Sequence, residues 1–514
     1  MSAGRGDGLD VRGGCGGVDA RLEDLVAAAA LLRRCGRELA AAAALLARLV
    51  GGPGMQVTGL LAPGTLAVVD TRAAAAVAGP DGLIPTAVRL EALGVALRVV
   101  VSGYRAADAA ADGAVHELEL AGGAAAARWF GVPLLVGAAG FGAGVVLGGA
   151  VGSGGSGEAA GSGEAAGSGQ AAGSWLLDLL GQHGDLAEHV VAAVPGFLDG
   201  MILPTALLPG TAVLAAVGMP LHDVPGVATL VGAAGAVVPG LREPARVQAT
   251  LQQGREVSPP RDLADLVDRV ASCYPAEPAG VPGAVGTAGR ARAGSGQPEP
   301  PAKVRVDQVI GPGGRRAWVV AVPGQQVMSL RGGTNPFDLA GDVHAMARQD
   351  TAAREGALAA MEVAGIPPGE PVLIAGHSQG GMVAASLAAD PKVRTRFHIT
   401  QVLTVGSPVA EFRVPPDVQV LSVEHADDAV PRLDGRPDPQ RAGWVTVRRT
   451  VHAPGAPTDA LRAHDLDEYR RTMALADRSQ DPSLRAYRAG LEPFLDRPGA
   501  VGWSNDVTVS RAAG

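Results

Sequence analysis

PVLIAGHSQGGMVAASLAAD, residues 371–390, decides the fold of the C-terminal part of this chain. Its apolar start, PVLIA, is typical of a buried strand, and an Ala-rich stretch over about 380–389 predicts a helix. Between them, GHSQG at 376–380 is a G-x-S-x-G pattern at the turn from strand to helix. Such a turn strains the serine backbone and exposes its oxygen above the sheet, while the flanking glycines relieve crowding. Ser378 is therefore the predicted nucleophile, and the alternative is a plain glycine-rich turn.

The sequence around this turn alternates between strand-like and helical stretches. VRVDQVI and AWVVAV flank GPGGRR at 311–316 and predict a β-hairpin, and a long helical stretch follows from about Phe337 to Ala364. Further apolar runs lie at 401–406, 418–424 and 444–451, and a final helix is expected to begin near His464. Strands that alternate with helices predict an α/β domain with a mainly parallel sheet covered on both faces.

A serine nucleophile needs a general base and an acid that orients the base. In this architecture the expected chain order is serine, then Asp or Glu, then His. The strand-like run at 418–424 is followed by Asp427 and Asp428, and either carboxylate suits the role. Of the histidines that follow, His452 ends the run at 444–451 and His464 opens the last predicted helix. The pattern alone separates neither the two acids nor the two bases, whereas His377 is expected to shape the turn.

The tetrahedral intermediate of acyl transfer needs hydrogen-bond donors for its oxyanion. The Gln379 amide, at the start of a helix, points towards developing negative charge. A second donor usually comes from the loop after an earlier strand. Here that loop is PGQQ at 323–326, with the amides of Gly324 and Gln325 as candidates. This chemistry needs no cofactor or metal.

Three motifs give the stretch from Val319 to Tyr469 a resemblance to the α/β-hydrolase superfamily, and within it to the lipase class 3-like branch. They are GHSQGG at 376–381, TVGSP at 404–408 and DAVPRLDG at 428–435. In that branch the Asp-x-Val-Pro-Arg-Leu motif carries the triad acid, so the resemblance favours Asp428. It implies hydrolysis of an ester or a lipid, without fixing the acyl chain or head group.

The same segment is similar to a group of actinobacterial hydrolases that have an NPFDLAGD-like loop, here at 335–342, and a late His followed by Tyr. This likeness makes His464, with Tyr469 close behind, the preferred base. One motif departs from the class 3 pattern. Those lipases carry Arg-Gly-Thr where this chain has Pro323-Gly324-Gln325, so the oxyanion loop differs.

Composition limits the other classes of function. The 514 residues are too many for one ordinary core, so several domains are expected. The net charge is −8 and no basic cluster stands out, which gives nucleic-acid binding no electrostatic support. The three cysteines, Cys15, Cys35 and Cys273, have neither the spacing of a metal site nor that of a disulfide framework.

The first 128 residues predict a helical domain. Residues 18–50 have apolar positions at helical spacing, GGPG at 51–54 ends that helix, and a second helix is expected over about 86–126. Together they suggest an antiparallel helical hairpin. Residues 129–152 carry no charge and are long enough to span a bilayer, so this apolar segment is either a membrane helix or a Gly/Ala-rich helix packed inside protein.

Two linkers divide the rest of the chain. Residues 153–174 form a Gly/Ser/Ala linker, and 276–302 form a second one rich in Pro and Gly. Between them, 175–275 is an apolar helical region that ends in a helix at about 261–274. The predicted hydrolase domain is 303–496, and 497–514 is predicted to be a tail.

The helical N-terminal region also bears on location and partners. Tyr104 and Asp108 form a Tyr-x-x-x-Asp motif, and with it residues 18–111 look like substrates and partners of type VII (ESX) secretion, although no Trp-x-Gly turn joins the helices. The N-terminus lacks the pattern of a cleavable signal peptide. Cytoplasmic, membrane-associated and type VII-exported locations stay open. The sequence thus predicts an esterase or lipase, and the alternative is an export- or membrane-associated binding protein with a vestigial hydrolase fold.

Overall fold

The computed structural model describes residues 8–16, 18–150, 246–252, 254–275, 299, 301–327, 333–452 and 460–512. The chain divides into two compact units, one of residues 18–115 and one of residues 1–17 and 116–514. The smaller unit is helical, and the larger one combines strands with helices.

The larger unit contains all of the strands among the described residues. They are β1 (Asp10–Gly13), β2 (Val247–Leu251), β3 (Arg255–Val257), β4 (Ala302–Ile310), β5 (Arg316–Val322), β6 (Pro371–His377), β7 (His398–Val405), β8 (Gln419–His425), β9 (Trp444–Arg449) and β10 (Val501–Arg511). Its helices are α9 (Leu263–Ala271), α10 (Leu339–Met346), α11 (Ala352–Val363), α12 (Gln379–Ala389), α13 (Pro391–Arg394), α14 (Ala460–Ala463), α15 (Leu466–Arg478) and α16 (Pro482–Gly490). Short 3-10 turns are η1 (Gly14–Gly16), η3 (Pro312–Gly314), η4 (Val430–Arg432) and η5 (Glu492–Phe494).

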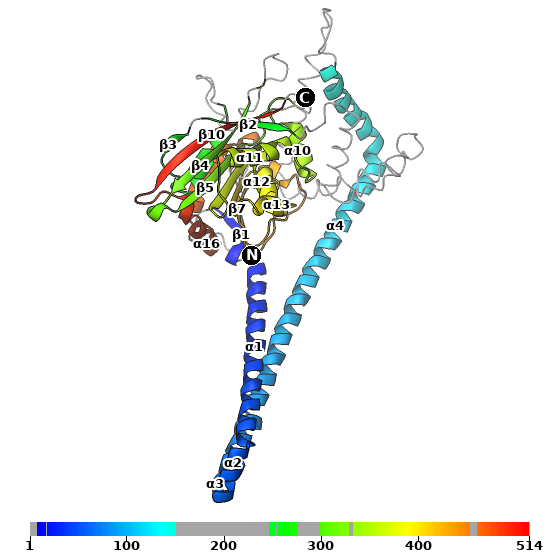
Figure 1. Cartoon of the computed structure of the whole chain (residues 1–514). Helices are drawn as coiled ribbons and strands as arrows, with labels where there is room; N and C mark the ends of the chain where they lie inside the picture. Colours follow the sequence, from blue (N-terminus) through cyan, green and yellow to red (C-terminus); the bar gives the residue numbers. More distant parts are fainter. Residues whose placement is uncertain are drawn as a thin grey trace, which may run out of the picture. The chain divides into compact units, whose positions relative to one another are not determined.

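A ten-stranded mixed sheet forms the centre of this unit (Figure 1). The strand order is β1-β9-β8-β7-β6-β5-β4-β10-β2, and β3 pairs with β10. Strands β5 to β9 are parallel to one another, whereas β1, β2, β3, β4 and β10 pair antiparallel. The predicted α/β class is confirmed, and so is the hairpin, which β4 and β5 form around η3.

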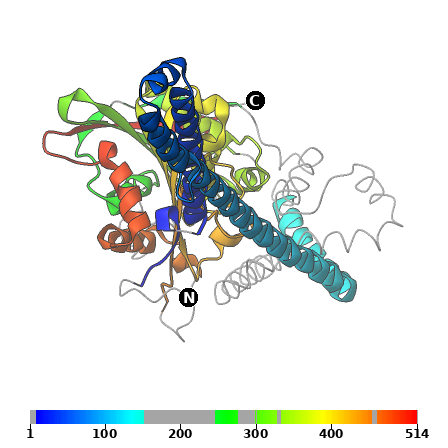
Figure 2. The ribbon, with the colours of Figure 1, turned by 90° about the horizontal axis from the view of Figure 1, so that it is seen from below.

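Helices cover both faces of the sheet, because successive side chains of a strand point to opposite sides. On β5, Val320 and Val322 belong to the core under α10, α11 and α12, while Val319 and Ala321 belong to the core under α9, α15 and α16. Figure 2 shows these two groups of helices on opposite sides of the strands. The helical stretch predicted from Phe337 to Ala364 is broken between α10 and α11.

The sheet extends beyond the range predicted for the hydrolase domain. Within residues 497–514, predicted to be a tail, Val501–Arg511 form β10, which pairs with β4 along nine residues. Val507 and Val509 are fully buried there, and Arg511 forms a buried ion pair with Asp338 at 2.7 Å. Strands β1, β2 and β3 also join from outside 303–496. The alternation of Val507 and Val509 was the available signal for this last strand.

The smaller unit is a helical hairpin with additional helices at its turn. α1 (Val18–Val50) coincides with the predicted helix, and α4 (Leu83–Ala150) begins near the predicted residue 86 but continues well past 126. α2 (Pro53–Leu61) and α3 (Pro63–Ala78) lie between them, where a simple turn was expected. α1 and α4 approach closely: a Cβ at Gly36 would lie 2.9 Å from the Ala87 carbonyl oxygen, and one at Gly94 2.8 Å from that of Ala29. These contacts make the pair antiparallel (Figure 1).

The predicted apolar segment 129–152 lies mostly outside what can be described. Its backbone is helical up to Ala150, as part of α4, but the side chains of 122–150 and all of 151–245 are outside the described residues. The predicted 153–174 linker and nearly all of the 276–302 linker also fall outside them. Within the described part of the chain, no helix is long and apolar enough to cross a membrane.

Candidate active site

Ser378 occupies the turn between β6 and α12, as predicted from the sequence. Its backbone angles are φ 53° and ψ −122°, and it is one of two described non-glycine residues with positive φ. L-residues rarely adopt this conformation, so the turn stores strain. The Ser378 amide donates to the Val405 carbonyl at 3.0 Å, which ties the turn to the end of the neighbouring strand β7. The hydroxyl therefore sits at the carboxyl ends of the parallel strands, where ligands of open α/β sheets bind.

The glycines of the G-x-S-x-G pattern are required by the crossing of strand and helix. A Cβ at Gly376 would clash with the Gly380 backbone, and one at Gly380 would clash with the carbonyls of Val322 and Pro323. A Cβ at Gly381 would clash with the Ser407 side chain. The sequence GHSQGG therefore allows the start of α12 to pass close to β5 and to the loop after β7.

Asp428 follows β8 and is almost completely buried, with 1% of its surface exposed. Its Oδ2 accepts hydrogen bonds from His464 Nδ1 and from the Tyr469 hydroxyl, both at 2.7 Å, and its Oδ1 accepts from the Val430 amide at 2.9 Å. Burial alone would raise the pKa of this carboxyl. The charge on His464 and these hydrogen bonds outweigh burial and hold the Asp428 pKa below its usual value.

His464 precedes α15 and lies beside the serine turn. Its Nδ1–H donates to Asp428, which leaves Nε2 as the acceptor that a general base needs. Its ring packs against that of His377, with centroids 4.7 Å apart. Among the described residues the Ser378 hydroxyl makes no hydrogen bond with His464, and such bonds are often long before substrate binds.

Gly406, from the TVGSP motif at 404–408, makes room for His464. Its φ is 63°, and a Cβ there would lie 3.0 Å from His464 Cε1 and 2.9 Å from Tyr469 Cε2. Its amide donates to the Val423 carbonyl at 2.9 Å, which fixes the loop after β7 against β8. A glycine is therefore needed both for the backbone conformation and for the two rings.

The alternative residues, Asp427 and His452, also form a pair. His452 Nδ1 hydrogen-bonds to Asp427 Oδ2, and the same carboxylate accepts from the backbone amides of Val451 and His452. Burial would raise the Asp427 pKa, but these amides, followed by the His452 side chain, lower it. Asp427 thus fixes the segment after β9, and the ring contacts of His377 are made by His464, Tyr469 and Tyr274 instead.

The predicted oxyanion donors, the amides of Gln325 and Gln379, differ from the Gly324 amide in their hydrogen bonding. The Gly324 amide is already occupied, because it donates to the Tyr274 hydroxyl at 2.6 Å. The Gln325 amide has no hydrogen-bond acceptor among the described residues, and the Gln379 amide is in the first turn of α12, where helix amides have no intrahelical partner. Of the two candidate amides in this loop, Gly324 is used by Tyr274, and Gln325 stays available.

The NPFD part of the 335–342 motif supports this loop. Asn335 Nδ2 donates to Gln326 Oε1 at 2.8 Å, and the Phe337 carbonyl accepts from the amides of Gln326 and Val327. Asp338 caps α10 by accepting from the Gly341 amide at 2.9 Å. Asn335, Phe337 and Asp338 are all fully buried. The motif therefore fixes the end of the loop at 323–327 through Gln326 and Val327.

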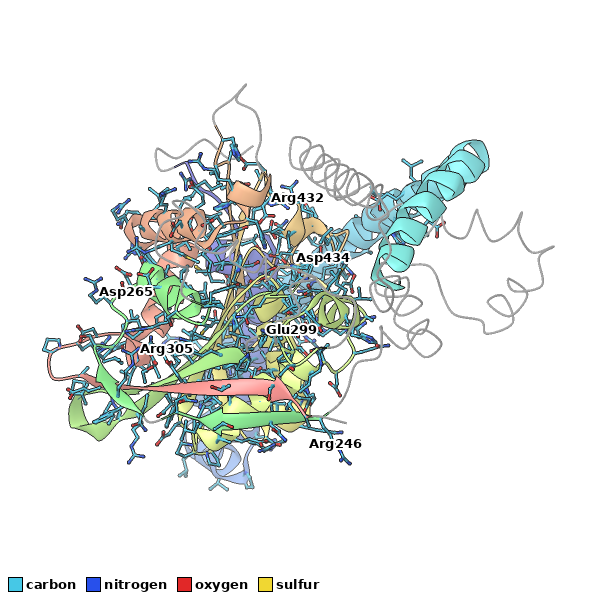
Figure 3. All side chains as sticks on the ribbon, turned by 90° about the horizontal axis from the view of Figure 1, so that it is seen from above. Arg246, Asp265, Glu299, Arg305, Arg432 and Asp434 are labelled. Atoms are coloured by element: carbon cyan, nitrogen blue, oxygen red, sulfur yellow. The ribbon has the colours of Figure 1, made fainter. Side chains whose placement is uncertain are left out.

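One sizeable cavity of the larger unit, about 450 Å³, lies elsewhere. It is lined by residues of β2 and α11, including Arg246 and Leu358, and by none of Ser378, Asp428 or His464. Figure 3 shows Arg246 far from Arg432, which lies on the turn just after Asp428. This cavity is therefore unrelated to the serine turn.

Comparison with known proteins identifies one related domain. Residues 359–476 match the model of the PGAP1-like alpha/beta domain. This range runs from α11 into α15 and includes Ser378, Asp428 and His464. Together with the large central sheet, it fits the α/β-hydrolase superfamily, the coarse class of the predicted resemblance. No curated protein and no solved structure matches the chain significantly. The finer likenesses, to class 3 lipases and to type VII secretion proteins, stay predictions.

Sequence reasoning missed residues that brace this site. Tyr274, at the end of the predicted 261–274 helix, belongs to no sequence motif, and Tyr469 enters the motifs only through its closeness to His464. His425 stacks on Tyr469 with centroids 3.9 Å apart, and burial lowers its pKa to about 4. The chain has only four tyrosines, and three of them are buried in this unit. Their rarity was the one available signal.

Proposed function

We propose that the C-terminal domain is a serine hydrolase that cleaves carboxylic esters through an acyl-enzyme. The main support is the strained turn that carries Ser378, next to a His464 ring whose Nδ1 is held by buried Asp428. In this proposal Ser378 is the nucleophile, His464 the general base and Asp428 the orienting acid. The amides of Gln379 and Gln325 bind the oxyanion.

The reaction proceeds in two half-steps. Ser378 Oγ attacks the ester carbonyl carbon while His464 Nε2 takes the hydroxyl proton, and the carbonyl oxygen becomes an oxyanion. The intermediate then collapses, the C–O bond to the alcohol breaks, and His464 returns the proton to the leaving alcohol. A water molecule attacks the acyl-enzyme in the same way, which releases the acid and restores Ser378.

Asp428 supports both half-steps. It holds His464 in the tautomer that leaves Nε2 free, and its charge stabilises the imidazolium that forms in each step. Its lowered pKa keeps it ionised at neutral pH. Tyr469 supplies a second donor to the same oxygen, and burial raises the pKa of this phenol well above its usual value, so it stays a neutral donor.

A fluorophosphonate probe and a panel of p-nitrophenyl esters of graded length test the proposal. The full chain should be labelled once and should hydrolyse at least one ester, and Ser378→Ala should abolish both activities. Ser386→Ala, which changes a serine within α12, is the matched control and should behave as the wild type. Labelling that survives Ser378→Ala would refute the nucleophile assignment. Labelling of the wild type without ester turnover would contradict the ester substrate and would favour peptide hydrolysis or acyl transfer instead.

A binding protein with a vestigial hydrolase fold is the alternative. The helical unit favours it, because large apolar side chains such as Leu31, Leu49 and Val99 are exposed along α1 and α4. Exposed apolar surface of this kind marks interaction sites. If the wild-type chain shows no labelling and no turnover, this alternative is supported. A type VII secretion component is then the partner to test for first.

Membrane contact through 129–152 is a separate proposal that rests on the sequence of this segment. Fractionation of cells that express the full chain, beside the same chain with Leu134, Leu135 and Val136 changed to Asp, measures it. Only the unaltered chain should sediment with membranes. Equal solubility of both chains would contradict it.

A further inference from the structure

Tyr274 contacts two parts of the proposed site through one hydroxyl group and is linked to a third part through His377. It follows α9, lies outside the matched range 359–476, and is 8% exposed. Its hydroxyl lies 2.6 Å from the Gly324 amide nitrogen and 2.7 Å from His377 Nδ1. The neighbouring Cys273 is buried, and its Sγ lies 3.4 Å from the Ala321 carbonyl oxygen, which fixes this segment against β5.

The direction of these hydrogen bonds follows from their partners. The His464 carbonyl can only accept, so His377 Nε2, 3.1 Å away, carries the proton. Burial, followed by the charge of His464, lowers the His377 pKa to about 3, so the ring is neutral and its Nδ1 accepts. Tyr274 then donates to Nδ1, and its oxygen accepts from the Gly324 N–H. One directed chain therefore runs from Gly324 through Tyr274 and His377 to His464.

The ends of this chain are the backbone segments that catalysis must hold in place. Gly324 precedes the oxyanion donor Gln325, and a Cβ on Gly324 would lie 2.8 Å from Ser378 Cβ. His377 directly precedes Ser378, and the His464 carbonyl belongs to the residue whose ring accepts the proton. The hydroxyl of Tyr274 thus connects the oxyanion loop, the nucleophile turn and the base.

We propose that Tyr274 is a positioning residue for the hydrolase site, which sets the spacing between the Gln325 amide, Ser378 and His464. The proposal rests on the proposed function. Tyr274 does not act on the substrate itself, since its hydroxyl is used by Gly324 and His377. Its removal should therefore slow the chemical steps more than it weakens substrate binding.

Tyr274→Phe and Tyr487→Phe in the full chain form a matched pair. Tyr487 is also buried in the same core, but its hydroxyl donates to the Val402 carbonyl at 2.9 Å and takes no part in the chain of bonds. Both variants lose one buried hydroxyl and should show similar falls in Tm. Tyr274→Phe should lower kcat by about ten- to a hundredfold with KM nearly unchanged, the loss that a small misplacement causes, while Tyr487→Phe should retain the wild-type kcat.

A double-mutant cycle with His377 tests the coupling. His377→Gln keeps one donor and one acceptor and should retain more activity than His377→Leu, which keeps neither. If both residues act through one chain, His377→Leu should cost far less kcat in the Tyr274→Phe background than in the wild type. Additive losses would contradict the coupling.

The outcomes separate this inference from the proposed function. A wild-type chain that neither hydrolyses esters nor reacts with a fluorophosphonate overturns both proposals. A reactive wild type, with Tyr274→Phe and Tyr487→Phe equal in kcat, overturns the positioning role alone. A fall in kcat with KM nearly unchanged, seen in Tyr274→Phe and not in Tyr487→Phe, supports the positioning role.

Discussion

Two aspartate–histidine pairs begin at adjacent residues of this protein, yet their surroundings differ. Asp428 binds His464 and the Tyr469 hydroxyl, and His464 packs against His377 next to the serine turn. Asp427 binds His452 together with two backbone amides of the segment after β9. A hydrogen-bonded pair alone therefore does not mark a catalytic site. In the proposed mechanism the Asp428 pair activates Ser378, and the Asp427 pair fixes the segment after β9.

Exchange of each acid for its amide should separate the pairs most strongly. We expect Asp428→Asn to lower kcat for a p-nitrophenyl ester by about 10⁴-fold, because an amide favours the wrong tautomer of the catalytic histidine. Asp427→Asn should keep kcat within about threefold of wild type, since it changes a bond outside the reaction. Steady-state kinetics with Tm as a folding control measure both. Equal losses would break the distinction.

Gly406→Ala should have the next largest effect. The added methyl group would push against His464 and Tyr469, and a shift of about 1 Å in the base costs about 10²-fold in kcat. Gly365→Ala is the control, because Gly365 has a similar φ of 72° with nothing near its Cβ position. Both variants carry the strain of a positive φ, the clash at Gly406 should cost additional stability, and only Gly406→Ala should lose turnover. If the two lose turnover equally, backbone strain explains the loss.

Tyr469→Phe should have a smaller effect on the Asp428 pair. It removes one hydrogen bond to an ionised carboxylate, worth about 1.5 kcal/mol, which corresponds to about a tenfold fall in kcat. It should also raise the pKa of Asp428, which this bond helps to lower. Kinetics beside Tyr487→Phe measure the effect. An unchanged kcat would show that His464 and the Val430 amide hold the acid without Tyr469.

Acid titration of stability should reveal the role of the other pair. The folded-state pKa of Asp427 is lowered, so its contribution is present above the usual value of 3.8 and is lost as the pH falls below it. Asp427→Asn should therefore lower the urea midpoint near neutral pH, and the difference from wild type should shrink at more acidic pH. A difference that is constant with pH would contradict the assignment.

The features of this protein that its sequence predicts well are local. The turn of Ser378 lies within ten residues of its strand and helix, and GHSQGG carries the crowding constraints of Gly376 and Gly380 directly. Strands β6 to β9 are apolar runs because both of their faces are buried. Helix α1 matched its predicted bounds because GGPG ends it.

The parts that depend on topology could not be predicted in this way. Asp427 and Asp428 follow the same strand end, and their histidine partners lie 25 and 36 residues further along the chain, where only packing brings them back to the strand end. Tyr274 lies 103 residues before His377 and meets it only because α9 packs on β5. Strand β10 has polar residues between its valines, so it was mistaken for a tail.

The rate of fluorophosphonate labelling in His464→Ala and His452→Ala tests the central claim most directly. This readout needs no knowledge of the natural substrate, because the probe reports only on activation of Ser378. We expect one adduct, located on Ser378 by peptide mass spectrometry. It should form at nearly the wild-type rate in His452→Ala and about 10³-fold more slowly in His464→Ala. Rapid labelling of His464→Ala, or an adduct on another residue, would contradict it.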